Sequence, residues 1–344
     1  MDITGNEAWV TFCMTTYKRP ELLKRQLEAI ARQTFTRWRI IISDNDPEGS
    51  AKRTVADLGD PRVSYAINEA NLGMVKSFNR SLSKATTEYV VMITDDDPVY
   101  PEMLQTLYDL TLAYPGYGMY MGGCDIVYYN PLVAKSSRMK VGANSCLADL
   151  PIGTVRKFTG REFAFAYFSN RLGVHLLWST GIVRRDVAMA IDGMPDFGAP
   201  YNTDFGYIAL SGARAGVVLL NSSLGFQSVH GANYGFTESD FEKFYITPEG
   251  FVSWVMQRLP AGEDFSALRP YIEAFTGRWV VEYAMSIKKY IREKNAPAED
   301  FSRVTRKIFR IPFLRKWRWK YYLAIYAPGV FPLLVRIKMK LFNK

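Results

Sequence analysis

Residues 89–97 read YVVMITDDD, an apolar run that passes directly into three adjacent aspartates, Asp95, Asp96 and Asp97. Such a run is typical of a strand buried on both faces of a parallel sheet. Three neighbouring carboxylates repel one another, so by themselves they are typical of a solvated loop. Ligands of α/β sheets, however, bind beyond the carboxyl ends of the strands. A divalent cation there would relieve the repulsion, because Mg²⁺ and Mn²⁺ prefer carboxylate and phosphate oxygens.

The sequence around this acidic triplet alternates between strand-like and helix-like segments. Strands are predicted at residues 10–15, 39–43, 63–67 and 89–94. Helices are predicted from Pro20 onward and at residues 73–85 and 101–114, with apolar side chains at helical spacing. This alternation predicts an α/β, Rossmann-like domain with a mostly parallel sheet flanked by helices.

Beyond residue 116 the pattern is less regular. Short strands are predicted at residues 117–122, 126–129 and 217–220, and helices at 161–168, 185–191 and within 248–294. We expect two halves of one catalytic domain, residues 1–125 and 126–247, followed by a helical region at 248–344.

Basic residues concentrate at the C-terminus. Residues 301–344 contain twelve lysines and arginines and no acidic residue, whereas residues 1–300 carry 31 basic and 34 acidic side chains. The uncharged stretch 321–335 is shorter than the roughly 20 residues that cross a bilayer as a helix. The pattern predicts a basic amphipathic tail on an anionic membrane surface. Four aromatic residues are expected at headgroup level: Trp317, Trp319, Tyr321 and Tyr322.

Two alternatives exist for this tail. Its apolar face can pack on the rest of the protein, or the tail can bind nucleic acid. The nearly neutral remainder offers no second basic surface, so nucleic acid is not an expected partner. The first residues lack the basic and apolar regions of a signal peptide, and three scattered cysteines favour a reducing compartment. We therefore expect peripheral attachment to the cytoplasmic side of the inner (plasma) membrane.

Four stretches together resemble the GT-A glycosyltransferases of family 2. They are VTFCMTTYKRPELLKRQLEAIARQ from Val10, IIISDNDPEGS from Ile40, NEANLGMVKSFNRSLSKATTEYVVMITDDD from Asn68, and, more loosely, the segment from Leu176 to Gly216. The last stretch departs from the family pattern, because Thr203-Asp204 stands where the family usually has Glu-Asp. The resemblance covers residues 9–130 well and 175–235 loosely. It implies a GT-A fold and an inverting transfer of sugar from a nucleotide-diphosphate sugar. Residues 1–125 would then bind the nucleotide sugar, and residues 126–247 would bind the acceptor.

The resemblance also implies roles for the donor-binding residues. Thr16 and Tyr17 would line the nucleotide pocket, and Thr15 would add a backbone contact. Asp44 would accept a hydrogen bond from the base. Asn71 and Gly73 would shape the loop beside the ribose and phosphates. Both the segment at Asp44 and that at Asn71 are also compatible with ordinary turns.

On the same basis, the acidic triplet would hold the donor phosphates and a Mn²⁺ or Mg²⁺ ion. Asp95 would face the ribose or the metal site, Asp96 would contribute to donor binding, and Asp97 would ligate the metal directly. His230 would complete the metal shell, or else be a loop histidine bonded to the backbone. A metal would offset the charge that gathers on the leaving diphosphate.

The acceptor hydroxyl needs a base, and the matching position is Asp204. Asp192 and Asp196 are rivals, and any of the three can instead be a surface or helix-capping residue. Trp178 is either a stacking platform for the acceptor or a core residue, and His175 is expected to be packed.

These expectations combine into one function. The chain is predicted to move a sugar from a nucleotide-diphosphate sugar to a lipid-linked, polyprenyl-diphosphate saccharide in the synthesis of a surface polysaccharide. The alternatives are a non-catalytic, glycosyltransferase-like membrane scaffold and a nucleotidyltransferase with a related fold. Thr203 favours the scaffold, whereas the absence of glycine in TTYKRPELL (Thr15–Leu23) argues against the nucleotidyltransferase.

Overall fold

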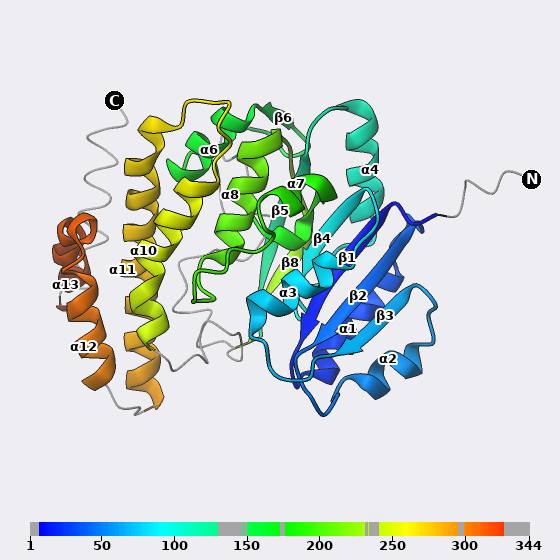
Figure 1. Cartoon of the computed structure of the whole chain (residues 1–344), viewed down its shortest axis with the longest axis horizontal. Coiled ribbons are helices and arrows are strands. Elements are labelled where there is room, and N and C mark those ends of the chain that lie inside the picture. The colour runs from blue at the N-terminus through cyan, green and yellow to red at the C-terminus, as the bar shows by residue number, and fades with distance from the viewer. Residues whose placement is uncertain are drawn as a thin grey trace, which may run out of the picture.

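A central sheet organises the chain. The computed structural model describes residues 7–129, 147, 150–172, 176–230, 233, 241–294 and 299–326. Within them, eight strands form one sheet in the order β3-β2-β1-β4-β7-β5-β8-β6, with helices on both faces (Figure 1). In chain order the strands are β1 (Val10–Thr16), β2 (Trp38–Asp44), β3 (Val63–Ile67), β4 (Tyr89–Ile93), β5 (Met119–Tyr128), β6 (Val155–Phe158), β7 (Gly181–Arg184) and β8 (Val217–Val229).

Helices cover the sheet, and further helices follow its last strand at the C-terminus. The α-helices are α1 (Pro20–Ala31), α2 (Lys52–Leu58), α3 (Met74–Ser83), α4 (Met103–Ala113), α6 (Gly160–Phe168), α7 (Arg185–Ala190), α8 (Thr203–Ala215), α10 (Phe241–Arg258), α11 (Arg269–Lys294), α12 (Glu299–Ile308) and α13 (Arg318–Tyr326). Short 3₁₀ turns are η2 (Trp178–Thr180), η3 (Ser266–Leu268) and η4 (Pro312–Trp317). The predicted α/β class with a mostly parallel sheet is confirmed.

The direction of the strands decides where a site can form. Strands β1 to β4, β5 and β8 all run the same way, while β6 and β7 run antiparallel to their neighbours. The carboxyl ends of the six parallel strands therefore share one edge of the sheet. Helix α8 leads into the amino end of β8 through Gly216, so its own first residues lie back toward that edge.

The sequence predicted the first half better than the second. The elements from β1 to α4 lie within a few residues of their predicted bounds, but α2 was missed because it buries no side chain. The two strands predicted at residues 117–122 and 126–129 are one strand, β5, with irregular pairing at Gly122 and Gly123. The predicted domain boundary at residue 125 falls inside β5, so both halves share the sheet.

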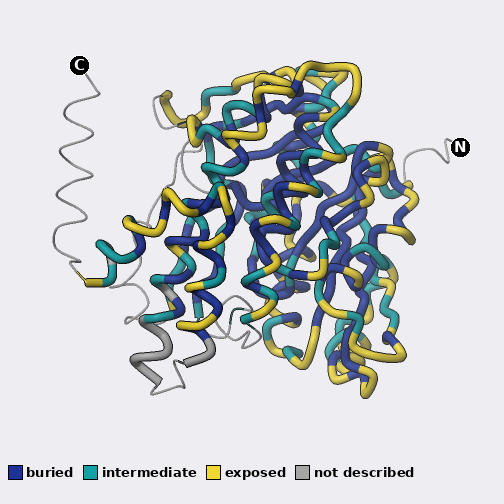
Figure 2. The backbone as a smooth tube through the Cα atoms, turned by 60° about the vertical axis from the view of Figure 1, so that its left-hand side comes forward, coloured by how far each residue is buried: buried dark blue, intermediate teal, exposed yellow. Residues whose placement is uncertain are grey.

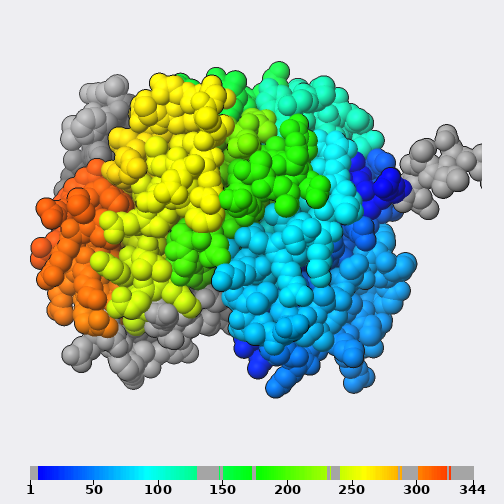
Figure 3. Space-filling view, viewed as in Figure 1, coloured from blue at the N-terminus to red at the C-terminus, as the bar shows by residue number. Residues whose placement is uncertain are grey.

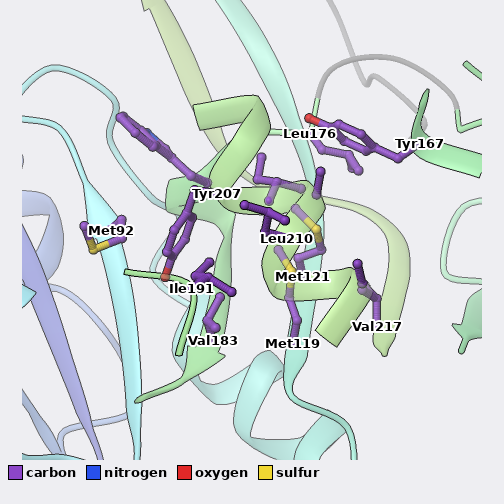
Figure 4. Packing of buried hydrophobic residues seen from close by; sticks show 14 of the residues in the cluster. Met92, Met119, Met121, Tyr167, Leu176, Val183, Ile191, Tyr207, Leu210 and Val217 are labelled. Carbon is purple, nitrogen blue, oxygen red and sulfur yellow. The ribbon is translucent and has the colours of Figure 1, made fainter. Parts of the chain in front are cut away.

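Each face of the sheet carries its own apolar core (Figure 2). One core joins α3, α6, α7 and α8 to the sheet, and Figure 4 shows its side chains, with Tyr207 and Leu210 of α8 above Met119 and Met121 of β5. The other core joins α1 and α4 to the opposite face. Burying both faces explains why β1 and β4 read as continuous apolar runs rather than alternating ones.

The C-terminal helices form a further layer that packs beside α6 and α8 (Figure 1), and Figure 3 shows this layer at one side of the molecule. Their apolar cluster joins α10 and α11 to the inward side of α12, η4 and α13. Trp317 and Tyr321 are buried in it, at 8% and 6% exposure, so the prediction that they lie at headgroup level is wrong. Tyr322 is half-buried, whereas Trp319 is exposed. The alternative that the tail packs on the protein therefore holds for residues 301–326, and residues 327–344 lie outside the described part.

A glycine permits the close docking of this layer. A Cβ added to Gly277 of α11 would lie 2.1 Å from Nε1 of Trp317, so a larger residue would push the indole away. Residues 301–326 are thus part of the folded protein. No helix in the described part of the chain is both long and apolar enough to cross a membrane.

Candidate active site

The acidic triplet follows β4 at the edge where the parallel strands end. Asp95, Asp96 and Asp97 are exposed by only 0%, 9% and 6%. The interpretation of the triplet as a solvated loop is therefore excluded. Carboxylates at this depth need cations or hydrogen-bond donors, because burial without partners is costly.

Arg19 supplies the main counter-charge, and the sequence analysis did not identify it. It lies between β1 and α1, where its Nε and Nη2 donate to the two oxygens of Asp95 and its Nη1 donates to Asp96 Oδ2 at 2.9 Å. The hydroxyl of Thr16 also donates to Asp95, at 2.7 Å. Burial raises the pKa of Asp95 although the charge of Arg19 opposes the shift. Because β1 and β4 are neighbours in the sheet, a basic residue just after β1 could have been identified from the sequence as a partner for the aspartates just after β4.

Asp96 and His230 contact each other at the end of β8. His230 Nε2 lies 3.2 Å from Asp96 Oδ2, and the His230 backbone N–H donates to Asn233 at 2.9 Å. Burial disfavours the charged form of Asp96, but the hydrogen bond with His230 and the charge of Arg19 outweigh it and lower the pKa. The structure thus places His230 beside Asp96, and Asn233 holds the turn after β8.

Asp97 is held by the protein itself. Its Oδ1 accepts the backbone N–H of Ser228 at 2.8 Å, and its Oδ2 accepts the hydroxyl of Thr94 at 3.1 Å. Its carbonyl oxygen accepts Gln26 of α1. Burial, followed by the charge of Asp96, raises the pKa of Asp97. Ser228 was not predicted because β8 was expected to end at Leu220, before its polar residues begin.

A cavity of about 190 Å³ opens beside the triplet. Asp95, Asp96 and His230 line it together with Arg25 of α1 and Tyr129, which follows β5. Asp97 does not line it. Four segments that are distant in the sequence thus meet at one opening: α1 and the segments that follow β4, β5 and β8. They meet because these three strands are parallel and end at the same edge of the sheet.

The carboxylate oxygens at this opening suit a divalent cation that also binds a diphosphate. Within the described residues, no group of three His, Cys, Asp or Glu side chains forms a complete metal cage. Magnesium-type sites often use only one or two carboxylates and take their remaining ligands from substrate phosphates and water. Asp95 and Asp96 offer such oxygens at the cavity, while Asp97 would first have to leave Ser228 and Thr94. The residues present therefore fit a cation brought with a substrate.

The predicted base-binding residue, Asp44, ends β2 and is fully buried. Its carboxylate accepts the hydroxyl of Tyr65 and the backbone N–H of Asp46, at 2.5 and 2.9 Å. Its backbone carbonyl accepts the N–H of Asn68. Asp44 therefore joins the ends of β2 and β3 and forms the turn that the sequence also allowed.

The other residues predicted to bind the nucleotide sugar lie around the hydrogen bonds of Asp44. Thr15 donates its hydroxyl to Ser77 of α3 at 2.6 Å, and Tyr17 is exposed by 43% at the same edge. Asn71 Oδ1 accepts the N–H of Gly73, whose φ of 79° suits glycine before α3 begins. The predicted nucleotide-binding residues thus gather at the carboxyl ends of β1, β2 and β3.

Asp204 is the second residue of α8, at the end of the helix that lies toward the site edge. It is only partly exposed, and burial raises its pKa to about 6, although backbone N–H groups at the helix start oppose the shift. Thr203 donates its hydroxyl to Pro200 O at 3.0 Å. Asp192 and Asp196 were the other candidates for the base. Asp192 pairs with Arg258 on the surface, and Asp196 is half-buried.

Two other predicted residues do not enter the site. Trp178 is 7% exposed and packs on Phe78 with ring centroids 5.0 Å apart, so it is a core residue and not a stacking platform. His175 lies outside the described residues. Of the residues predicted for the acceptor side, Asp204 at the start of α8 therefore remains a candidate.

Comparisons with known proteins agree with this geometry. Residues 11–172 match the family model "Glycosyl transferase family 2". The UDP-Glc:alpha-D-GlcNAc-diphosphoundecaprenol beta-1,3-glucosyltransferase WfgD of Escherichia coli is 23% identical over 145 residues, 42% of this chain and 57% of that protein. The GalNAc(5)-diNAcBac-PP-undecaprenol beta-1,3-glucosyltransferase of Campylobacter jejuni is 31% identical over 112 residues, 32% of this chain and 36% of that protein. The chain thus spans between about a third and somewhat over half of these curated relatives.

Solved structures share the fold over nearly the whole chain. The structure of S. aureus TarS 1–349 in complex with UDP-GlcNAc superposes with a TM-score of 0.62 at 14% identity, covering 91% of this chain and 88% of that one. The mannosyltransferase PcManGT from Pyrobaculum calidifontis, in complex with GDP-Man and Mn²⁺, gives a TM-score of 0.52 at 14% identity and covers 95% and 88%. The match of residues 11–172 and the likeness to solved structures over nearly the whole chain lead to one conclusion: the chain has the GT-A fold, and its residues 11–172 are similar to glycosyl transferase family 2.

Proposed function

We propose that the chain transfers a sugar, with inversion, from a nucleotide-diphosphate sugar to a lipid-linked saccharide in the synthesis of a surface polysaccharide. The observation that carries the proposal is the buried triplet Asp95–Asp97 with Arg19 and His230 at the carboxyl edge of a parallel sheet. Two relatives named as acting on undecaprenol-linked saccharides support the choice of acceptor.

The donor would bind along the ends of β1 to β4. The base and ribose would lie by Tyr17, Asp44 and the loop from Asn71 to Gly73, and the diphosphate would reach the cavity at Asp95 and Asp96. Mn²⁺ or Mg²⁺ bound there would offset the negative charge of the leaving diphosphate. Asp95 and Asp96 would hold the cation, with His230 orienting Asp96 and Asp97 available if it releases Ser228.

The acceptor would approach from the start of α8. Asp204 would take the proton from the acceptor hydroxyl, and a pKa of about 6 leaves it ionised at neutral pH yet more basic than an ordinary aspartate. Thr203 cannot supply a second carboxylate, so Asp204 would act alone. A non-catalytic scaffold would not need a base poised in this way.

We also propose that the protein lies on an anionic membrane surface, at the cytoplasmic side, through its C-terminal layer. Of the four aromatic residues expected there, Trp319 is exposed by 57%. Tyr326, at the end of α13, was not among the four and is exposed by 74%. The basic side chains of this layer are largely exposed while its apolar side chains pack inward. This arrangement would bring the site to an acceptor carried by lipid.

A screen of donors tests the proposal. Thermal shifts would be measured for the full chain with UDP, GDP, dTDP and their sugar conjugates, each with and without Mn²⁺. At least one nucleoside diphosphate is expected to raise the melting temperature by several degrees in the presence of Mn²⁺, because ligands that bind only the folded state stabilise it. A flat response to all of them would contradict the proposal.

A further inference from the structure

One basic residue at the cavity has no role in the account above. Arg25, on the second turn of α1, lines the same opening as Asp95 and Asp96. It lies six residues beyond Arg19, but the two side chains have different partners. Arg19 donates from Nε, Nη1 and Nη2 to the carboxylates, so its guanidinium is largely used within the triplet.

Arg25 is held in place by an aromatic residue. Its Nη2 donates to the hydroxyl of Tyr129 at 2.9 Å, and its guanidinium carbon lies 5.3 Å from the centroid of the Tyr129 ring. The backbone of Tyr129 is tied down, since its N–H donates to Val229 O at 2.9 Å and thereby joins the ends of β5 and β8. An arginine that already has such a partner loses less side-chain entropy on binding a ligand than an arginine without one.

The guanidinium keeps donors for a ligand. Arginine has five N–H donors, and within the described contacts Arg25 uses one of them, toward a neutral hydroxyl, and forms no ion pair. The lining of the cavity therefore combines carboxylates with a guanidinium. A phosphate fits this pattern, because its oxygens can bind a cation at the carboxylates and accept hydrogen bonds from arginine.

We propose that Arg25, positioned by Tyr129, binds a phosphate of a diphosphate substrate in this cavity. The inference rests on the proposed function. Two substrates of that reaction carry a diphosphate, the nucleotide-sugar donor and the polyprenyl-linked acceptor. Both offer the same chemistry to Arg25, and an experiment separates them.

The first measurement is donor affinity by isothermal titration calorimetry at saturating Mn²⁺. Arg25→Gln and Lys24→Gln would be compared, because Lys24 is the exposed neighbour on α1 and does not line the cavity. If the donor diphosphate is bound, Arg25→Gln weakens binding of the matching nucleoside diphosphate on the order of tenfold, leaves binding of the free nucleoside unchanged, and Lys24→Gln changes neither.

The second measurement is the KM for a short-chain prenyl-diphosphate saccharide. If the acceptor diphosphate is bound, Arg25→Gln raises this KM on the order of tenfold while donor affinity stays the same. Tyr129→Phe, which removes the hydroxyl that positions Arg25, is expected to give a smaller change in the same quantity. Arg25→Lys, which keeps the charge without the planar fork, is expected to recover part of the loss.

The inference is overturned if Arg25→Gln and Lys24→Gln behave alike in both measurements while the wild type binds donor and acceptor. A wild type that binds neither substrate would instead contradict the proposed function. Because Arg25 is exposed, Arg25→Gln should fold normally, and a melting curve for each variant confirms this.

Discussion

At the scale of single residues, the site depends on how three buried carboxylates are neutralised. Arg19 contacts two of them, and Asp97 relies on the Ser228 N–H and the Thr94 hydroxyl. One arginine and one divalent cation together carry three positive charges, which equals the charge of the triplet when all three carboxylates are ionised. Arg19 would therefore allow a single cation to complete the balance when substrate binds.

Arg19→Gln should destabilise the protein in the absence of ligand. The variant leaves the buried carboxylates of Asp95 and Asp96 without a cation, and because Arg19 is 29% exposed we expect a loss of about 1–3 kcal/mol. Denaturant unfolding without metal measures it. The double variant Arg19→Gln/Asp95→Asn, which removes the orphaned charge as well, should recover part of the loss; equal stability of the single variant and the wild type would refute this role.

The raised pKa of Asp204 and its proposed role as base lead us to expect a particular pH profile and a change in stability. The base must be ionised, so kcat should fall about tenfold per pH unit below about 6 and level off above it. Asp204→Asn should lower kcat by about 10²–10⁴-fold. Burial raises the folded-state pKa, so ionised Asp204 costs stability as pH rises through about 6.

The melting temperature of Asp204→Asn at pH 7.5 should therefore equal or exceed that of the wild type, and the difference should shrink at pH 4. An active Asp204→Asn variant would exclude Asp204 as the base. Parallel substitution of Asp192, which pairs with Arg258 on the surface, serves as the control and should leave kcat unchanged.

At the scale of elements, the C-terminal layer has one face packed on the protein and one face exposed. The inward face buries Phe301, Ile308 and Leu314 against α10 and α11. Truncating the chain after Asp300 would uncover that apolar surface, so truncation cannot test membrane binding cleanly. Substitutions on the exposed side of α12, η4 and α13 keep the packed face intact.

A quadruple glutamine variant of Arg306, Arg310, Lys316 and Arg318 should lose affinity for anionic vesicles. Each basic residue near an anionic surface contributes about 1 kcal/mol, so a loss on the order of a hundredfold or more is expected. Co-sedimentation with phosphatidylglycerol vesicles measures it, with neutral vesicles as reference. The control replaces four exposed basic residues from the other end of the molecule: Lys24, Lys52, Arg53 and Lys84. Equal loss in both variants, or none in either, would contradict a specific membrane-facing layer.

Elements also show where sequence patterns fail. The strands β1, β2 and β4 were predictable because both faces are buried and their residues form continuous apolar runs. Helix α2 has no buried side chain, so it leaves no apolar periodicity to detect. Strand β8 continues past Leu220 into Asn221, Ser222 and Ser223, and these polar residues concealed its second half and the position of Ser228.

At the scale of the whole molecule, the fold and the place of the site followed from the order of strands and helices. The partners within the site did not, because contacts such as Arg19 with Asp95 and Ser228 with Asp97 join residues 76 and 131 positions apart. The charge of the tail was visible in the sequence, but its division into a packed and an exposed face required the structure. Trp317, predicted at a membrane and found in a core, illustrates the difference.

The central claim is that the acidic triplet performs metal-dependent sugar transfer. The most direct measurement is the release of nucleoside diphosphate from the donor that binds, with Mn²⁺ or with EDTA, for the wild type, Asp96→Asn and Asp97→Asn. The account predicts turnover by the wild type only with metal, and a loss of at least about a hundredfold in Asp96→Asn, with the fold retained. Turnover that persists in EDTA, or at the wild-type rate in both variants, would contradict it.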